Sequence, residues 1–206
     1  MPEWGDIMDK PKVLPVLPWE NVLFPGMLLP MHVNESQDIA LVDWCLDRFG
    51  EFGLALESDE TDYPRDVGTI AKIIDYQQQE DEGVTLLVTG EHRYSACEMI
   101  DDNPFITALV EPFPFRFETS VQDLEDRANQ ARRLFNRCLR VIASQRGDIQ
   151  GMLTLPERVD DLGWAIAASL AVPSPERQVL LEKESAALLL QSEILYLESF
   201  LAELRG

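Results

Sequence analysis

The hydrophobic pattern changes its period about 120 residues into the chain. Before that point, short apolar runs alternate with polar positions and are broken by glycine and proline, which is typical of β-strands and turns. After it, apolar residues recur at every third or fourth position, which predicts amphipathic helices. The pattern therefore predicts an α+β protein with a β-rich part, residues 12–117, followed by a helical bundle, residues 118–206.

The first apolar segment, residues 14–33, has the sequence LPVLPWENVLFPGMLLPMHV and predicts two strands around a turn at Pro25 and Gly26. Proline presets φ and glycine tolerates a positive φ, so this pair favours a tight turn. Proline cannot donate to a β-ladder, so both strands are expected to be edge-like or bulged. The prolines inside them are Pro15, Pro18 and Pro30.

Apolar periodicity and turn residues predict the remaining elements. Gly90 is expected to mark a bulge or tight bend. Ser174 and Pro175 are typical of a helix start, because serine caps a helix and proline suits its first turn. The expected elements are a helix at 37–49, strands at 52–56, 67–76, 84–89, 93–99 and 105–111, a polar hairpin loop at 77–83, and helices at 120–145, 160–171, 176–184 and around Leu190 to Leu204.

Two further motif blocks follow the proline-rich opening segment. The first combines VGTIAKI at 67–73, LLVTGEHRYSA at 86–96 and PFITALVEP at 104–112, and the second combines DDLGWAIAASL at 160–170 with PSPERQVLLE at 173–182. With the opening segment, and in this order, they resemble the LON domain, the substrate-binding N-terminal domain of the Lon ATP-dependent proteases. The resemblance implies a PUA-like β pseudo-barrel with one helix, followed by the helical bundle. The positions that match recurring LON residues are Gly68, Gly90, Arg93, Ala108 and Glu111.

Lon proteases continue after this domain with an ATPase and a serine–lysine protease domain. The sequence contains no GxxxxGK[ST] segment that could hold a triphosphate. We therefore expect a stand-alone LON domain that is not an enzyme. The chain also departs from the family after its second strand, where it keeps Glu35 but lacks the aromatic and basic residues of the pattern. Its ligand preference is expected to differ accordingly.

Charge narrows the classes of partner. The net charge is −20, and the residues up to Arg116 account for −16 of it. Such a field repels nucleic-acid phosphates and anionic lipid, so neither nucleic acid nor membrane is an expected partner. RNA binding through the PUA-like barrel is kept as the alternative function, and an unrecognised hydrolase is a third hypothesis.

The sequence gives no sign of a metal, a cofactor or a disulfide framework. The cysteines, at positions 45, 97 and 138, lack CxxC spacing and are expected to be free, buried thiols in a reducing compartment. His32 and His92 have no ligand at zinc spacing, and the acidic segments lack the order of a calcium loop. With neither a signal peptide nor an apolar run of about 20 residues, the protein is expected to be cytoplasmic.

The LON resemblance implies a non-enzymatic module that binds exposed hydrophobic or unfolded polypeptide segments. This suggests an adaptor in protein quality control, with a separate Lon-type protease as a partner. Flexible methionine and flat aromatic side chains could adapt to varied peptides, although the same residues could instead pack a seam between sheet and helices. Tyr76 could offer its ring beside an acidic loop, or pack on its cross-strand neighbour. The candidate peptide-binding residues are Leu23, Phe24, Met27, Tyr76, Phe113 and Phe115.

Overall fold

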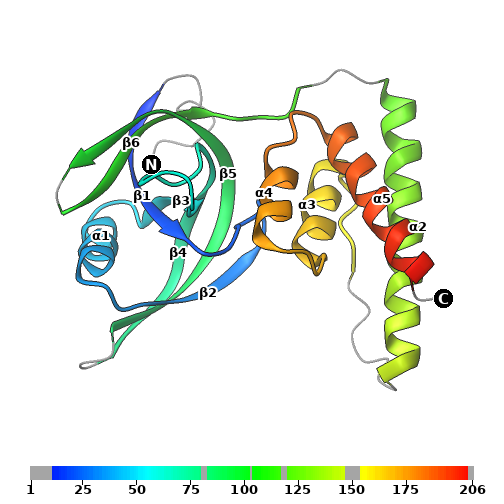
Figure 1. Cartoon of the computed structure of the whole chain (residues 1–206), viewed down its shortest axis with the longest axis horizontal. Helices are drawn as coiled ribbons and strands as arrows, with labels where there is room; N and C mark the ends of the chain where they lie inside the picture. The colour runs from blue at the N-terminus through cyan, green and yellow to red at the C-terminus, as the bar shows by residue number, and fades with distance from the viewer. Residues whose placement is uncertain (1–10, 80–82, 103, 117–119, 147–153, 204–206) are drawn as a thin grey trace. The chain divides into compact units, whose positions relative to one another are not determined.

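The computed structural model describes residues 11–79, 83–102, 104–116, 120–146 and 154–203. Within these ranges the chain forms six strands and five helices, so the predicted α+β class is confirmed (Figure 1). In chain order the elements are β1 (Lys12–Trp19), β2 (Leu28–Val33), α1 (Ser36–Leu46), β3 (Glu51–Leu56), β4 (Val67–Gln79), β5 (Gly83–Asp102), β6 (Phe105–Pro112), α2 (Val121–Arg146), α3 (Val159–Ser169), α4 (Ser174–Leu181) and α5 (Ala186–Glu203).

The chain folds as two compact units. The β-unit combines the described residues up to Pro114 with Val172–Glu182, and the helical unit combines Phe115–Ala171 with the chain from Lys183 onward. Helix α4 therefore belongs to the β-unit, whereas the division predicted between residues 117 and 118 puts it in the helical bundle. The apolar period of α4 identifies a buried face but does not show which unit that face packs against.

A single six-stranded sheet forms the β-unit. Its strand order is β2-β5-β4-β3-β1-β6, and β6 also pairs with β5, so the sheet closes on itself. Closure depends on the length of β5, which pairs with β2 through its first half and with β6 through its second half. The sequence predicts two separate strands here, at 84–89 and 93–99, but β5 runs continuously through Gly90. This closed sheet is the predicted pseudo-barrel.

The prolines lie where a β-ladder tolerates them. Pro30 is in β2, the first strand in the sheet order, and so occupies an edge. Strand β1 pairs with β6 over residues 12–15 and with β3 over residues 16–19. Within the described residues, each half of β1 is thus paired on one side only. Pro15 and Pro18, which have no N–H to donate, are tolerated because a strand paired on one side does not need every N–H. β2 is therefore an edge strand, as predicted, whereas β1 lies between β3 and β6 in the sheet order.

Strict alternation along β2 and β5 sets the barrel interior. On β5, Val84, Leu86 and Val88 are buried, whereas the residues between them are only half-buried. Leu29, Met31 and Val33 of β2 face the same interior, opposite those residues in the register. They contribute to one apolar cluster with residues from the other strands and from α1, among them Leu17, Leu41, Val42, Phe52, Leu54 and Ala71.

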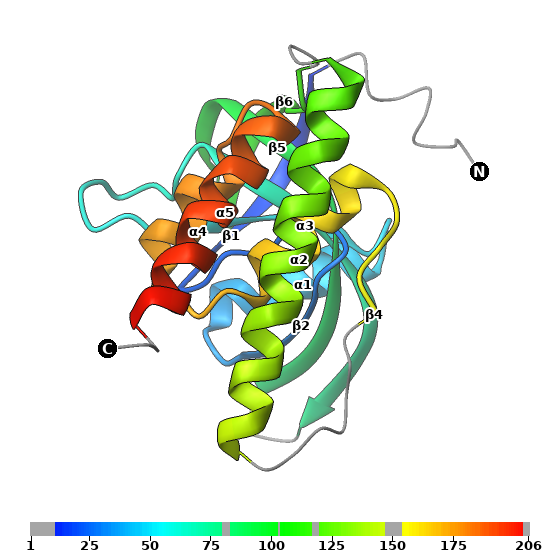
Figure 2. The same cartoon turned by 90° about the vertical axis from the view of Figure 1, so that its right-hand side faces the viewer.

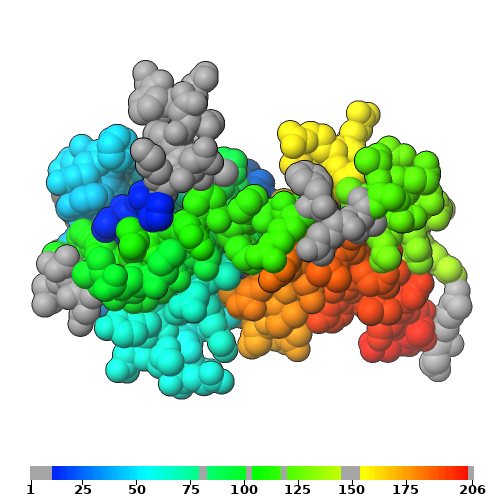
Figure 3. Space-filling view, turned by 90° about the horizontal axis from the view of Figure 1, so that it is seen from above, coloured from blue at the N-terminus to red at the C-terminus, as the bar shows by residue number. Residues whose placement is uncertain are grey.

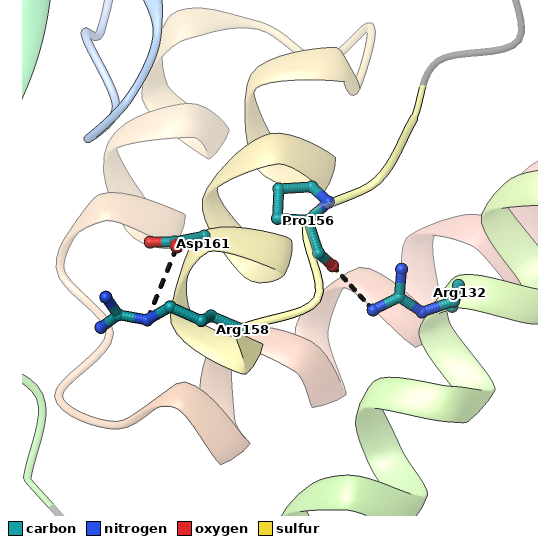
Figure 4. Close-up of polar contacts among 4 residues, drawn as sticks. All are labelled: Arg132, Pro156, Arg158 and Asp161. Carbon is teal, nitrogen blue, oxygen red and sulfur yellow. Dashed lines mark hydrogen bonds and ion pairs between the residues drawn. The ribbon is translucent and has the colours of Figure 1, made fainter.

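The helical unit is built around α2 and α5, which run side by side (Figure 2). Arg132 of α2 holds the segment before α3, because its guanidinium donates to the Pro156 carbonyl at 2.7 Å (Figure 4). An exposed ion pair of 3.6 Å joins Arg158 to Asp161 at the start of α3. The core of this unit includes Ala131, Phe135, Leu162, Ile166, Leu190, Ile194, Leu197 and Leu201.

One carboxyl group lies inside this helical core. Glu193 of α5 is fully buried, and among the described residues neither side-chain oxygen has a hydrogen bond of good geometry. Burial raises the pKa of Glu193 well above its usual value, and the neighbouring Ala167 backbone only partly opposes this shift. The side chain is therefore held in its neutral form over a wider pH range than a surface glutamate.

Glu193→Gln is expected to stabilise the protein at pH 8 by about 1–3 kcal/mol, because wild-type Glu193 must bind a proton on folding at that pH and the glutamine amide does not. In the unfolded chain this carboxyl loses its proton near pH 4.3, about the ordinary value, whereas the folded state retains it to higher pH. The folded state then binds more protons, so the free energy of unfolding falls as pH rises through this window. Urea unfolding at pH 5 and pH 8 measures the change.

The matched control is Glu198→Gln, which alters an exposed carboxyl on the same helix. The advantage of Glu193→Gln over wild type should grow between pH 5 and pH 8, while the control stays within about 0.5 kcal/mol of wild type. If the difference in unfolding free energy between wild type and Glu193→Gln is the same at pH 5 and pH 8, Glu193 does not change its protonation state on folding.

Candidate functional site

The segment Phe24–Met27 forms a tight turn between β1 and β2. The Met27 amide donates to the Phe24 carbonyl at 3.0 Å, and Gly26 has a φ of 76°. With Pro25 before a glycine at positive φ, this is the geometry of a type II turn. The turn predicted from Pro25 and Gly26 is therefore present, and it sets where β2 begins.

Strands β4 and β5 fix this turn to the barrel. The Gly26 amide donates to the Gly90 carbonyl at 2.8 Å, and the Gly90 amide donates to the Met27 carbonyl at 2.9 Å. From β4, the buried Thr69 hydroxyl donates to the Leu23 carbonyl at 2.6 Å. Gly90 is needed because the turn backbone passes directly over it, and a Cβ there would overlap the Phe24 carbonyl oxygen.

Helix α4 holds the turn from a third side. The Arg177 guanidinium lies 4.9 Å from the Phe24 ring centroid and donates to the Val22 carbonyl at 3.3 Å. The same group reaches the Met27 sulfur at 3.6 Å. Burial lowers the pKa of Arg177, but arginine remains charged at neutral pH. This cation thus stabilises the turn from a helix about 150 residues further along the chain.

Further polar contacts join α4 to the sheet. Gln178 donates to the Val67 carbonyl at 2.9 Å, and the Ser174 hydroxyl donates to the Glu20 carbonyl at 2.9 Å. Ser174 was predicted to cap α4, but the cap residue is Pro173, and Ser174 instead bonds to the chain beyond β1. Arg93 of β5 is buried and donates to the Leu181 carbonyl at 2.5 Å. The matched LON position Arg93 therefore supports α4 rather than facing solvent.

The turn residues predicted to contact a peptide differ in exposure. Leu23 and Phe24 are 1% and 0% exposed, so they pack the interior and hold the turn in place. Met27 is half-buried, and Leu28 beside it is 57% exposed. At this end of the turn, the apolar surface open to solvent is therefore offered by Met27 and Leu28.

The two predicted phenylalanines outside the turn belong to different units. Phe113 is half-buried in the β-unit, with the Arg93 guanidinium 4.6 Å from its ring centroid. Phe115 belongs to the helical unit and stacks on Trp164 at a centroid distance of 4.8 Å. The grouping of these rings with the turn in one peptide site stays a prediction.

Tyr76 lies inside β4, opposite Leu86 in the register, and is 53% exposed. It thus lies on the core-facing side of the strand, where the sheet leaves much of its ring uncovered. The loop predicted at 77–83 is shorter than expected, because β4 extends to Gln79 and β5 begins at Gly83. The acidic residues 80–82 that were expected beside Tyr76 lie outside the described residues.

An apolar stripe on the outer face of β2 and β5 was not predicted as a site. We define it as Leu28 and Pro30 of β2 with Leu87 of β5; Pro30 and Leu87 are register partners. Ile74, the extra residue of a bulge in β4 beside Leu87, is 53% exposed. The signal was present in the sequence, because apolar residues occur at alternate positions that the strand pattern assigns to solvent.

Charged residues flank the stripe on β4, where the exposed Asp75 is the register partner of Leu87 and Lys72 is the partner of Thr89. Lys72 pairs with Glu91 at 3.4 Å, and exposed His32 lies 3.4 Å from the Thr85 hydroxyl.

Across the described part of the chain, no three histidine, cysteine or acidic side chains are grouped so as to hold a metal ion. None of the described helices is long and apolar enough to cross a membrane.

The cysteines are free, as predicted, but they do not share one environment. Cys45 and Cys138 are buried, whereas Cys97 is exposed on β5. The prediction of buried thiols is therefore wrong for Cys97, where the side chain points away from the barrel interior. Burial raises the pKa of the Cys45 thiol to about 12, which makes this group inert at neutral pH.

The sequence is similar to that of several Lon proteases. The chain is 27% identical to a Lon protease of Anaeromyxobacter dehalogenans over 184 residues, which is 84% of the chain and 22% of that protein. A Lon protease of Cytophaga hutchinsonii is 36% identical over 119 residues, 53% of the chain and 15% of the protein. The chain thus spans about a fifth of the length of these relatives.

Solved structures agree with this fold. The N-terminal domain of a Lon protease from the Mycobacterium avium complex matches 91% of the chain and 98% of that domain, with a TM-score of 0.71 at 20% identity. A Lon N-terminal domain protein from Xanthomonas campestris gives a TM-score of 0.64 at 23% identity, over 88% of the chain and 96% of that protein. The model of the ATP-dependent protease La (LON) substrate-binding domain matches residues 13–199, so the chain belongs to the LON substrate-binding domain family.

Proposed function

We infer that the chain binds exposed hydrophobic segments of unfolded polypeptides through the apolar stripe and the adjoining Met27. The observation that carries this proposal is the solvent exposure of Leu28 and Pro30, with the half-buried Met27 and Leu87 beside them, next to a turn fixed at three points. Membership of a substrate-binding family supports a binding role and names no particular client. A rigid support with an apolar face suits ligands that differ in sequence but share exposed hydrophobic side chains.

Strand β2 suggests how such a ligand lies. An extended peptide can add to an open sheet edge through main-chain hydrogen bonds. Pro30 removes one donor from β2, which weakens that mode at this edge. The outer face carries the alternating apolar side chains instead, and the flexible thioether of Met27 can adapt to varied shapes. We therefore propose packing of client side chains on the face of the sheet.

The role of this binding is proposed from the family. The relatives named above are Lon proteases, and the matched part is their substrate-binding domain. We propose that the chain acts in the cytoplasm as a non-enzymatic adaptor in protein quality control, presenting unfolded clients to a separate Lon-type protease. The acidic charge of the first half supports polypeptide rather than nucleic acid as the ligand.

Leu28→Ser is expected to weaken capture of an unfolded protein about tenfold. The reason is that removing a contact of one apolar side chain forfeits about 1.5 kcal/mol or more, and 1.4 kcal/mol is a tenfold change in affinity. The probe is a reduced protein whose thiols are blocked with iodoacetamide, and its affinity is measured by fluorescence anisotropy. The melting temperature should stay near that of wild type, because Leu28 is exposed.

Val13→Ser is the matched control, since Val13 is 61% exposed in β1 of the same unit but lies outside the stripe. Its affinity for the probe should equal that of wild type. Equal binding by wild type, Leu28→Ser and Val13→Ser would remove the stripe as the binding surface. The absence of measurable binding by wild type would remove the proposed function itself.

A further inference from the structure

A pocket of about 270 Å³ opens on the β-unit between α1, β1 and the start of β6. Parts of these three elements lie side by side on the face shown in Figure 3, with α1 in light blue, β1 in dark blue and β6 in green. The volume lies just below the range typical of sites for drug-sized ligands, so it suits one side chain or a small molecule. Its apolar wall consists of Val16, Pro18, Leu41 and Ile106.

The other side of the pocket carries acidic and aromatic groups. Asp38 of α1 and Asp62 of the β3–β4 connection line it, together with the rings of Tyr63 and Phe105. Tyr63 is 40% exposed, so its ring remains available to a ligand. No lysine, arginine or histidine is among the residues that line the pocket, so the two carboxylates face it without a basic residue of the lining between them.

A metal ion does not account for this arrangement. Calcium and magnesium need several converging oxygen ligands, and the described residues show no group of three candidate ligands. Two carboxylates beside two rings and an aliphatic wall instead suit an organic cation with an apolar stem. Among protein side chains, arginine combines a long apolar stem with a flat cation that stacks on aromatic rings and pairs with carboxylates.

We propose that this pocket binds an arginine side chain of an unfolded client, so that clients are selected for a basic residue as well as for apolar segments. The inference rests on the proposed function, because the cation is carried by the same polypeptide that packs on the apolar stripe. The guanidinium pairs with Asp38 and Asp62, its plane lies against Tyr63 or Phe105, and its stem contacts the aliphatic wall. The strongly acidic first half of the chain draws such clients toward the β-unit.

The ionisation of Asp38 gives the pocket a pH dependence. Burial, followed by the nearby Glu35 and Glu57, raises the pKa of Asp38 to about 6. The other titratable groups facing it are Asp62 and Tyr63, whereas β1 and β6 supply uncharged residues to the lining. Asp38 is therefore charged at pH 7.5 and largely neutral at pH 5. Preference for a cationic side chain should accordingly weaken at pH 5.

The test uses two unstructured peptides that share the same leucine and phenylalanine residues and differ at one position, arginine in one and citrulline in the other. Citrulline keeps the shape of arginine and lacks its charge. Wild type should bind the arginine peptide about tenfold more tightly at pH 7.5, the size of one charge-assisted contact. Asp38→Asn combined with Asp62→Asn should reduce this preference to less than about twofold, with the citrulline peptide unaffected.

Asp43→Asn is the matched control, because it removes an exposed carboxyl from α1 outside the pocket and should leave the preference intact. Agmatine, a small guanidinium compound with no peptide backbone, tests the pocket independently by NMR. At pH 7.5 it should shift the amide signals of residues 37–41 and 105–106 in wild type and not in the double variant.

Equal affinity of wild type for both peptides would overturn the arginine pocket while leaving the proposed function intact. If neither peptide binds and the blocked unfolded protein is not captured, the proposed function fails. Agmatine shifts in the pocket would then show that the cation site exists although the chain does not bind unfolded polypeptide. The absence of these shifts would overturn the pocket as well.

Discussion

Gly90→Ala is expected to destabilise the β-unit by about 3 kcal/mol or more. The Cβ of alanine would overlap the Phe24 carbonyl oxygen, and it would lie 2.9 Å from the Phe24 carbonyl carbon and 3.1 Å from Leu23 Cγ. Two of these are backbone atoms, so the turn must move away as a whole. Such a shift breaks the two hydrogen bonds that join Gly90 to Gly26 and Met27, each worth about 1 kcal/mol, and adds the cost of overpacking.

Equilibrium unfolding in urea measures this effect, with Thr89→Ala as the control. Thr89 is the preceding residue of β5 and is only half-buried, so its truncation should cost far less. If both variants lose stability by similar amounts, close contact between the turn and Gly90 does not hold the turn in place.

Arg177→Ala is expected to cost about 3 kcal/mol of stability. The substitution removes a buried guanidinium that donates to the Val22 carbonyl and lies over the Phe24 ring. A hydrogen bond to a charged donor contributes about 1.5–3 kcal/mol, and a desolvated cation–π contact about 2 kcal/mol, whereas relief of the desolvation of the cation offsets part of the loss. The truncated side chain also leaves a cavity between α4 and the turn.

Val179→Ala supplies the control on the same helix, because Val179 is 50% exposed and contributes little to the contact with the barrel. Calorimetric melting should place Arg177→Ala well below this control. Capture of unfolded protein by Arg177→Ala should also weaken at temperatures where it remains folded, since the turn that supports Met27 and Leu28 loses its third anchor. A melting temperature equal to that of the control would show that α4 does not stabilise the turn.

Local sequence signals account for the parts of the fold that were predicted. The Pro25–Gly26 pair specifies its turn through φ values alone, and the strand prolines mark positions where a ladder partner is missing. The change from alternating to helical period separates strands from helices because each period follows from the geometry of its own element. These features need no knowledge of distant residues.

The remaining features depend on contacts between segments far apart in the chain. A short helix such as α4 shows a buried face in its pattern, but not that the face carries Arg177 onto a turn near the start of the chain. The apolar residues Leu23 and Phe24 were assigned to a binding surface because a hydrophobic pattern does not tell a core residue from an exposed one. Leu28 and Leu87 were not assigned to a site, although their alternate positions in the strand pattern place them on the solvent side of the sheet.

The central claim is that unfolded polypeptide binds to the outer face of β2 and the first half of β5. Hydrogen exchange followed by mass spectrometry, with and without a saturating unfolded protein at pH 7.5, tests it most directly. The expected result is slower exchange in peptides covering residues 24–33 and 83–90, with little change in α2 and α5. Protection confined to the helical unit, or no protection anywhere despite measured binding, would contradict the proposed site.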